Sequence, residues 1–147
     1  MRKFNPLIHH RQSIRLKGYD YSSAGSYFIT ICTQDRRHLF GHIEAGEMIL
    51  NDMGQIIEEQ WLALPSRFPN IGLGSFIIMP NHVHFIIEIL EKQTVTVGAV
   101  AGAFKSLCVH HILKKQKADN YDLIIGKIWQ RNLWEHIIRN ADEQWAI

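Results

Sequence analysis

The stretch that decides the fold of this chain is Phe76-Ile77-Ile78-Met79-Pro80-Asn81-His82-Val83-His84-Phe85-Ile86-Ile87. Apolar residues on both sides of Pro80-Asn81 predict two β-strands joined by a tight connection. Because successive side chains of a strand point to opposite faces, His82 and His84 are expected to share one face. Two imidazoles side by side on a strand supply half of a metal site. Two ordinary core or surface histidines would give the same pattern, so the interpretation as a metal site depends on the other motifs of the chain.

The composition indicates a single globular domain. A chain of 147 residues can bury about two-thirds of its unfolded surface. Hydrophobic residues make up 46% and charged residues 20%, and no run approaches the roughly 20 apolar residues of a membrane span. The N-terminus has no apolar stretch of the signal-peptide type. Cys32 and Cys108 have no metal-type spacing, so we expect free thiols in a cytoplasmic protein.

Basic residues are unevenly distributed, although the formal net charge is only +2. They gather in four regions, which are residues 2–17, Arg36-Arg37, residues 105–117 and residues 127–139. A cluster of this kind is usually a solvated surface, and contact with nucleic acid is the alternative.

The pattern of apolar residues predicts the order of the elements. Strands are expected at 27–33, 47–50, 74–79 and 82–90, with a last strand within 128–138. One helix follows the N-cap residues Asn51-Asp52 and ends at Pro65 and Pro69, and a second helix covers 97–112. Residues 1–20 are expected to form a basic arm, and residues 140–143 begin a final helix. This order predicts an α+β, ferredoxin-like fold, in which an antiparallel sheet carries its helices on one face and leaves the other free for a partner.

Three separated motifs together resemble the single-tyrosine HUH transposases, in particular the REP-associated branch of the insertion-sequence-200-like family. The motifs are Tyr27-Phe28-Ile29-Thr30-Ile31-Cys32-Thr33 with Arg36 and Leu39-Phe40-Gly41, then Met79-Pro80-Asn81-His82-Val83-His84, then Trp129-Gln130-Arg131-Asn132-Leu133-Trp134-Glu135-His136-Ile137-Ile138-Arg139-Asn140. The resemblance runs from about Tyr27 to Ile147.

The resemblance implies a ferredoxin-like domain that binds single-stranded or hairpin DNA and acts in DNA transposition. His82 and His84 match the histidines with which the family holds a divalent ion, Mg²⁺ or Mn²⁺, against the scissile phosphate. A family tyrosine then forms a 5′-phosphotyrosine link. Members of the family occur as monomers and as dimers, so a homodimer is one expectation here.

The sequence departs from the family at the nucleophile. The family tyrosine lies on the last helix, beyond the stretch that matches Trp145-Ala146-Ile147. The tyrosines of this chain are Tyr19, Tyr21, Tyr27 and Tyr121, and none is at the matching position. We therefore expect residues 1–147 to form one HUH domain with its last helix cut short, either as the product of a truncated gene or as a degenerate remnant. Such a chain would bind DNA without cleaving it.

Several further residues are candidates for DNA contacts. Arg36, Arg37, Lys105 and Arg131 could meet phosphates, with plain solvation as the alternative. Trp129 and Trp134 could stack on unpaired bases, although alternating positions on a strand are more typical of a core. Glu88 is expected on the same face as the two histidines. It could support the metal site, and the alternative is a solvated edge residue.

Two other functions stay open. One is a DNA-hairpin-binding module without chemistry, which the missing tyrosine favours. The other is a metal-dependent hydrolase that uses the two histidines and water. Hydrolytic sites for hard ions usually also contain carboxylates, and no carboxylate cluster accompanies this pair.

Overall fold

The computed structural model of the chain describes residues 24–91, 95–119, 127–131 and, for the backbone only, 134–138. The expected basic arm, the final helix and the side chain of Trp134 lie outside the described residues. The elements in chain order are β1 (Gly25–Cys32), the short 3-10 turn η1 (Gln34–Arg36), β2 (Gly41–Glu44), β3 (Glu47–Leu50), α2 (Asp52–Arg67), β4 (Ile71–Met79), β5 (His82–Ile89), α3 (Val97–Ala118) and β6 (Trp134–Ile138).

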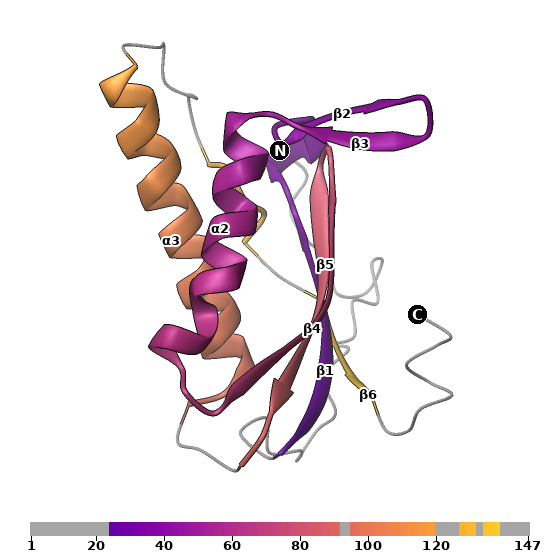
Figure 1. The fold of residues 1–147 in the computed structure, drawn as a ribbon, viewed down its shortest axis with the longest axis vertical. Coiled ribbons are helices and arrows are strands. Elements are labelled where there is room, and N and C mark those ends of the chain that lie inside the picture. The colour runs from indigo at the N-terminus through magenta and orange to yellow at the C-terminus, as the bar shows by residue number, and fades with distance from the viewer. Residues whose placement is uncertain (1–23, 92–94, 120–126, 132–133, 139–147) are drawn as a thin grey trace, which may run out of the picture.

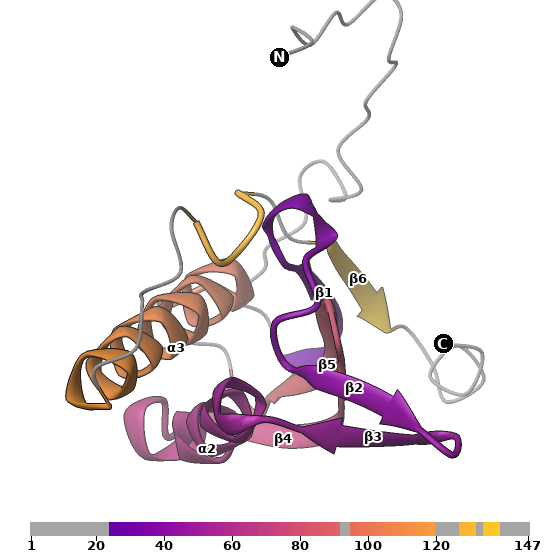
Figure 2. The same ribbon diagram turned by 90° about the horizontal axis from the view of Figure 1, so that it is seen from above.

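Four of the strands form one sheet in the order β4-β5-β1-β6, and each neighbouring pair is antiparallel. α2 and α3 lie side by side on one face of this sheet (Figure 1). The predicted α+β, ferredoxin-like architecture with its helices on one face is therefore confirmed. β2 and β3 form a separate two-stranded ribbon, which projects away from the body of the molecule (Figure 2).

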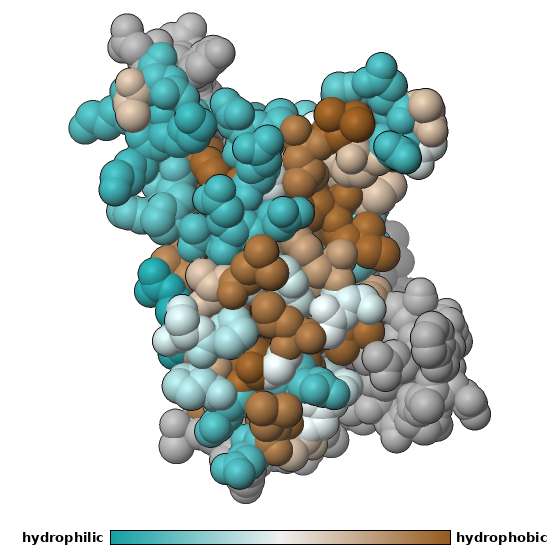
Figure 3. All heavy atoms as spheres, viewed as in Figure 1, coloured by the Kyte–Doolittle hydropathy of each residue, from teal (hydrophilic) through white to brown (hydrophobic). Residues whose placement is uncertain are grey.

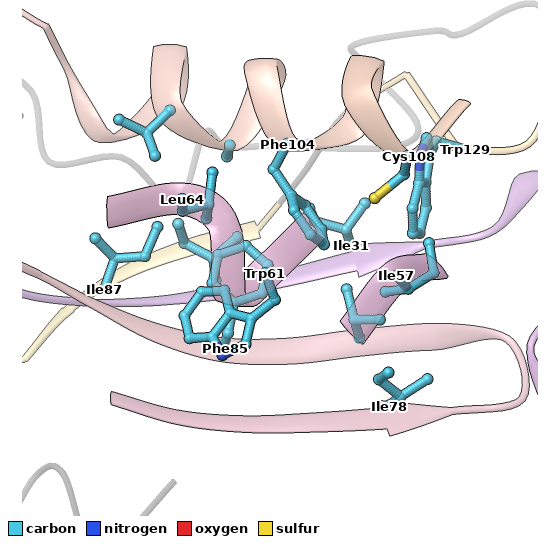
Figure 4. Packing of buried hydrophobic residues seen from close by; sticks show 14 of the residues in the cluster. Ile31, Ile57, Trp61, Leu64, Ile78, Phe85, Ile87, Phe104, Cys108 and Trp129 are labelled. Atoms are coloured by element: carbon cyan, nitrogen blue, oxygen red, sulfur yellow. The ribbon is translucent and has the colours of Figure 1, made fainter. Parts of the chain in front are cut away.

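The alternation of β5 fixes which side of the sheet becomes the core. Val83, Phe85, Ile87 and Ile89 are at most 2% exposed and face the helices. Figure 4 shows Phe85 and Ile87 beneath the helices, among the other side chains of the core. Burying an apolar side chain of this size contributes about 1.5–3 kcal/mol, so a shift of one residue in register would cost most of the core.

Aromatic rings fill the space between α2 and the sheet. Trp61 of α2 stacks on Phe76 of β4 with a centroid distance of 4.8 Å, and it meets Phe85 of β5 at the same distance. On the α3 side, the ring of Phe104 meets that of Phe85 at 5.3 Å. These contacts fix both helices to the two strands that flank the Pro80-Asn81 connection.

The helices and β4 differ in their bounds from the sequence prediction, and α3 continues to Ala118 instead of ending at residue 112. α2 continues through Pro65 to Arg67, because a proline near the end of a helix removes only one backbone hydrogen bond. The amide of Phe68 still donates to the carbonyl of Leu64 at 2.9 Å, and the helix ends before Pro69. β4 begins at Ile71 instead of residue 74, with an irregular register between Leu73 and Phe76.

The last predicted strand is divided. Trp129 forms an isolated bridge with Thr33, and β6 itself begins at Trp134. Residues 127–131 are therefore a separate segment along the end of β1.

Hydrophilic residues gather over the upper parts of α2 and α3 in Figure 3, whereas a hydrophobic band runs from the β2–β3 ribbon down the middle of the same face. Among the helices that the structure describes, none has the length and apolar composition of a membrane span.

Two helical glycines give opposite predictions for the same substitution. In Gly54→Ala, the new Cβ would clash with the backbone carbonyl oxygen of Phe40. We therefore expect a loss of roughly 1–3 kcal/mol in the free energy of unfolding, although alanine favours helices. At Gly102 of α3, an added Cβ would have no neighbouring atom within 4 Å, so Gly102→Ala should gain up to about 1 kcal/mol. Denaturant unfolding of both variants measures this, and equal effects of the two would contradict the packing described for α2.

Candidate metal centre and nucleic-acid interface

His82 and His84 lie on β5, on the sheet face that the helices leave open, and both are partly buried. Their ring centroids are 4.5 Å apart and the ring planes are inclined by 75°. The prediction that the two imidazoles share a face is confirmed. Metal binding by the pair stays a prediction at this point.

Each ring is held through its Nδ1 atom. Nδ1 of His82 lies 2.7 Å from Oδ1 of Asn81, and Nδ1 of His84 lies 2.8 Å from the hydroxyl oxygen of Thr30. An amide oxygen only accepts hydrogen bonds, so this contact favours the neutral tautomer of His82 with its proton on Nδ1 and its lone pair on Nε2. Phe28 also stacks on the His84 ring at a centroid distance of 5.5 Å. Histidines that bind metals are typically held in this way, with one nitrogen fixed and the other directed at the ion.

The pKa of both histidines is lowered. Burial is the main cause for His82, and the positive charge of Arg36 adds to it. For His84 the pKa is lowered by burial and then by the neighbouring His82. Because a metal binds only the neutral imidazole, a lowered pKa keeps both rings ready for an ion at a lower pH than an ordinary histidine.

The described residues do not supply a cluster with a third ligand. Within residues 24–91, 95–119 and 127–131, no three side chains of His, Cys, Asp or Glu come together in a metal-binding cluster. Glu88 is exposed and pairs across the sheet with Ser26. It is four residues beyond His84, roughly 13 Å along the strand. Glu88 is therefore solvent-exposed, as the sequence favoured, but it lies on an internal strand and not at the edge of the sheet.

The turn after β1 places Arg36 beside the histidine pair. Asp35 and Arg36 both have a left-handed backbone, with φ values of 57° and 52°, which is unfavourable for residues other than glycine. Thr33 holds the turn, because its buried hydroxyl lies 2.8 Å from the carbonyl oxygen of Arg37 and 3.1 Å from that of Asn81. The side chain of Arg36 is exposed, so its charge is accessible to a phosphate on the open face.

Arg37 and Lys105 contact the segment 127–131. Nη2 of Arg37 donates to the carbonyl of Lys127 at 2.6 Å. Nζ of Lys105 donates to the carbonyl of Gln130 at 2.7 Å. Both side chains thus brace this segment against the body of the domain, a role that the sequence did not predict. Arg131, at the end of the segment, is exposed.

Trp129 is a core residue. It is 5% exposed, and its ring meets those of Phe40 and Phe104 at centroid distances of 5.2 and 6.4 Å. Figure 4 shows it next to Cys108, beneath α3. Because the side chain is almost fully buried among these rings, the prediction that Trp129 stacks on a DNA base was wrong, and the alternative of a core position is correct. Burial raises the pKa of the Cys108 thiol, and both cysteines are free, as predicted.

Three contributors were missed from the sequence. Thr30 contacts His84 because β1 and β5 pair in the register that sets them opposite each other, and this register was not part of the sequence prediction. Asn81 precedes His82 in the chain, so a side-chain contact with the ring could have been anticipated. Lys127 was noted only as part of a basic region.

No protein-family model matches the chain. In structure, the chain is similar to a REP-associated tyrosine transposase bound to a REP hairpin, with a TM-score of 0.63 at 20% identity over 90% of this chain and 67% of the other. It is also similar to a candidate transposase of Deinococcus radiodurans R1, with a TM-score of 0.59 at 11% identity over 90% of this chain and 91% of the other. At this level of identity, these similarities establish a transposase-like fold.

In sequence, the chain is 39% identical to an uncharacterised protein of Haemophilus influenzae over an alignment of 158 residues. The alignment covers 94% of this chain and 84% of the relative. The chain therefore belongs to the same protein family as this Haemophilus influenzae protein, and its fold is transposase-like.

Proposed function

We propose that this chain binds single-stranded or hairpin DNA on the open face of its sheet, and that His82 and His84 hold a divalent metal ion against a DNA phosphate. The observation that carries the proposal is the geometry of the pair, with the rings 4.5 Å apart and both Nδ1 atoms engaged. The solved transposase of similar fold is bound to a REP hairpin, which supports DNA as the partner.

The residues present fit a divalent ion. Two neutral imidazoles whose Nδ1 atoms are engaged suit Mn²⁺ better than Mg²⁺, which prefers oxygen ligands. When bound, the ion would act as a Lewis acid and stabilise charge on a phosphoryl oxygen. Thr30 and Asn81 keep the rings oriented, and Arg36 adds a positive charge beside His82.

A non-catalytic DNA-hairpin-binding module is the second candidate function. The position of Tyr27 bears directly on this alternative. Its side chain is fully buried in the core. A nucleophile must reach the phosphate in line with the leaving oxygen, and a buried ring on the helix side of β1 cannot do so. Strand cleavage by Tyr27 is therefore excluded from the proposal, which rests on DNA and metal binding.

Metal binding should depend on both histidines. We expect the purified chain to bind Mn²⁺, and His82→Ala or His84→Ala to abolish the binding. Thr30→Ala and Asn81→Ala should weaken it by about 10–100-fold, because they remove the contacts that orient the rings. Titration followed by the EPR signal of free Mn²⁺ measures the affinity. His110→Ala, which removes an exposed histidine of α3, is the matched control. Equal losses in this control and in His82→Ala would refute the site.

The lowered pKa values predict a direction for proton binding. In the metal-free protein, both histidines should titrate with midpoints below 6.5, the ordinary value for histidine. Because the folded state then binds fewer protons than the unfolded state, the two groups reduce stability as the pH falls through this range. In His82→Gln, a neighbouring charge is lost, and the midpoint of His84 should rise in part toward 6.5. NMR titration of the ring Cε1 protons measures both midpoints, and values above 6.5 in the wild type would contradict the described burial.

DNA binding should be strong at low salt and weaken steeply as salt rises, because phosphate contacts release counterions. Arg36→Gln should weaken binding and flatten the log–log dependence of affinity on salt by about 1. Arg67→Gln is the matched control, since Arg67 is an exposed arginine at the end of α2. Fluorescence anisotropy with a labelled hairpin and a labelled single strand gives the affinities. A folded protein that binds neither DNA at low salt would disprove the proposed function.

A further inference from the structure

A cavity of about 510 Å³ lies between α3 and the segment 127–131, away from the histidine pair. Its volume is within the roughly 300–1,000 Å³ of small-molecule sites, so it is larger than a lone ion requires. Three cationic side chains line it, from Lys105, Lys127 and Arg131. No Asp or Glu is among the described residues that line it.

The ammonium group of Lys105 is held in place. Nζ of Lys105 is held by the carbonyl of Gln130 at 2.7 Å and lies 3.4 Å from that of Arg131. The pKa of Lys105 is lowered by burial and then by the charge of Lys127. Like charges held together in this way favour an anion between them, because the anion relieves their repulsion.

The rest of the lining is largely apolar. Val109 and Leu113 of α3, Ile128 and part of Trp129 form this apolar wall, beside Ser106 and Gln130. An apolar wall beside convergent cations suits a ligand with a flat ring at one end and a phosphate at the other.

The cavity is connected to the histidine pair through the end of β1. The amide of Gln130 donates to the carbonyl of Cys32 at 2.9 Å, and Cys32 pairs with His82 across the sheet. Two strand spacings, about 10 Å, therefore separate the backbones of Gln130 and His82. Arg36, whose charge acts on His82, and Arg37, whose Nη2 donates to the carbonyl of Lys127, are neighbours in the turn after β1.

We propose that this cavity binds one unpaired nucleotide of the DNA strand, with the phosphate on Lys105, Lys127 and Arg131 and the base against the apolar wall of α3. The inference rests on the proposed function, because the nucleotide belongs to the strand whose neighbouring phosphate lies at the histidine pair. It adds a second contact on the far side of β1, which would fix the direction and register of the strand.

The test uses a labelled single-stranded oligonucleotide and three variants of the full chain. Lys127→Ala with Arg131→Ala should weaken binding about tenfold and flatten the log–log salt dependence by about 1. Ser106→Phe fills the cavity from an exposed position on α3, and it should weaken binding without a change of charge. Lys114→Ala with Lys117→Ala removes the same charge from α3 outside the cavity and should change affinity less than twofold. Thermal melting verifies that each variant is folded.

The outcomes separate this inference from the proposed function. If the wild type binds no oligonucleotide, the proposed function fails and the inference fails with it. If the wild type binds and the two double variants lose affinity equally, or if Ser106→Phe binds like the wild type, only the cavity assignment is overturned. Thymidine monophosphate that raises the melting temperature without being displaced by the oligonucleotide would also overturn it, since the ligand would then be a free nucleotide.

Discussion

The alternation of β5 between β4 and β1 is the constraint on which the rest of the structure depends. Every second residue from Val83 to Ile89 is buried against the helices, and each of these contacts is lost if the strand slips by one position. The same slip would turn His82 and His84 into the core, where an unpaired polar ring is costly. The hydrophobic effect therefore fixes the position of the histidine pair, although neither histidine contributes much to it.

The orientation of the rings depends on a second layer of contacts. Thr30 reaches His84 only because β1 pairs with β5 in one register, and Asn81 reaches His82 from the connection between β4 and β5. Thr33 ties the end of β1 to the same connection through the carbonyl of Asn81. The pair is thus supported by rigid strands on both sides, which is the arrangement that a metal site or a phosphate site requires. The strained turn at Asp35 and Arg36 is held by the same contacts and keeps a positive charge beside the pair.

The sequence was sufficient for the fold because its strongest patterns are local. The alternation around His82, the helical spacing in α3 and the cap at Asn51, which accepts a hydrogen bond from the amide of Gly54, all appear in the structure. The effect of Pro65 on the helix was misjudged. Packing of Trp61 and Leu64 stabilises α2 beyond this proline, although one backbone hydrogen bond is missing. Trp129 was ambiguous for a different reason. Its place under α3 depends on a bridge to Thr33, which is far away in the chain, and no local pattern contains that information. The cavity beside Trp129 could not be predicted from the sequence for the same reason, since it exists only where α3 meets the segment 127–131.

The central claim is that the open face brings a DNA phosphate and a divalent ion together at His82 and His84. The most direct measurement is a crystal structure of the chain with a DNA hairpin, grown in Mn²⁺, with the metal located by its anomalous scattering. The account predicts one strong anomalous peak bonded to Nε2 of both histidines and to an oxygen of a DNA phosphate. DNA bound elsewhere on the molecule, or a manganese site that excludes the two histidines, would contradict it.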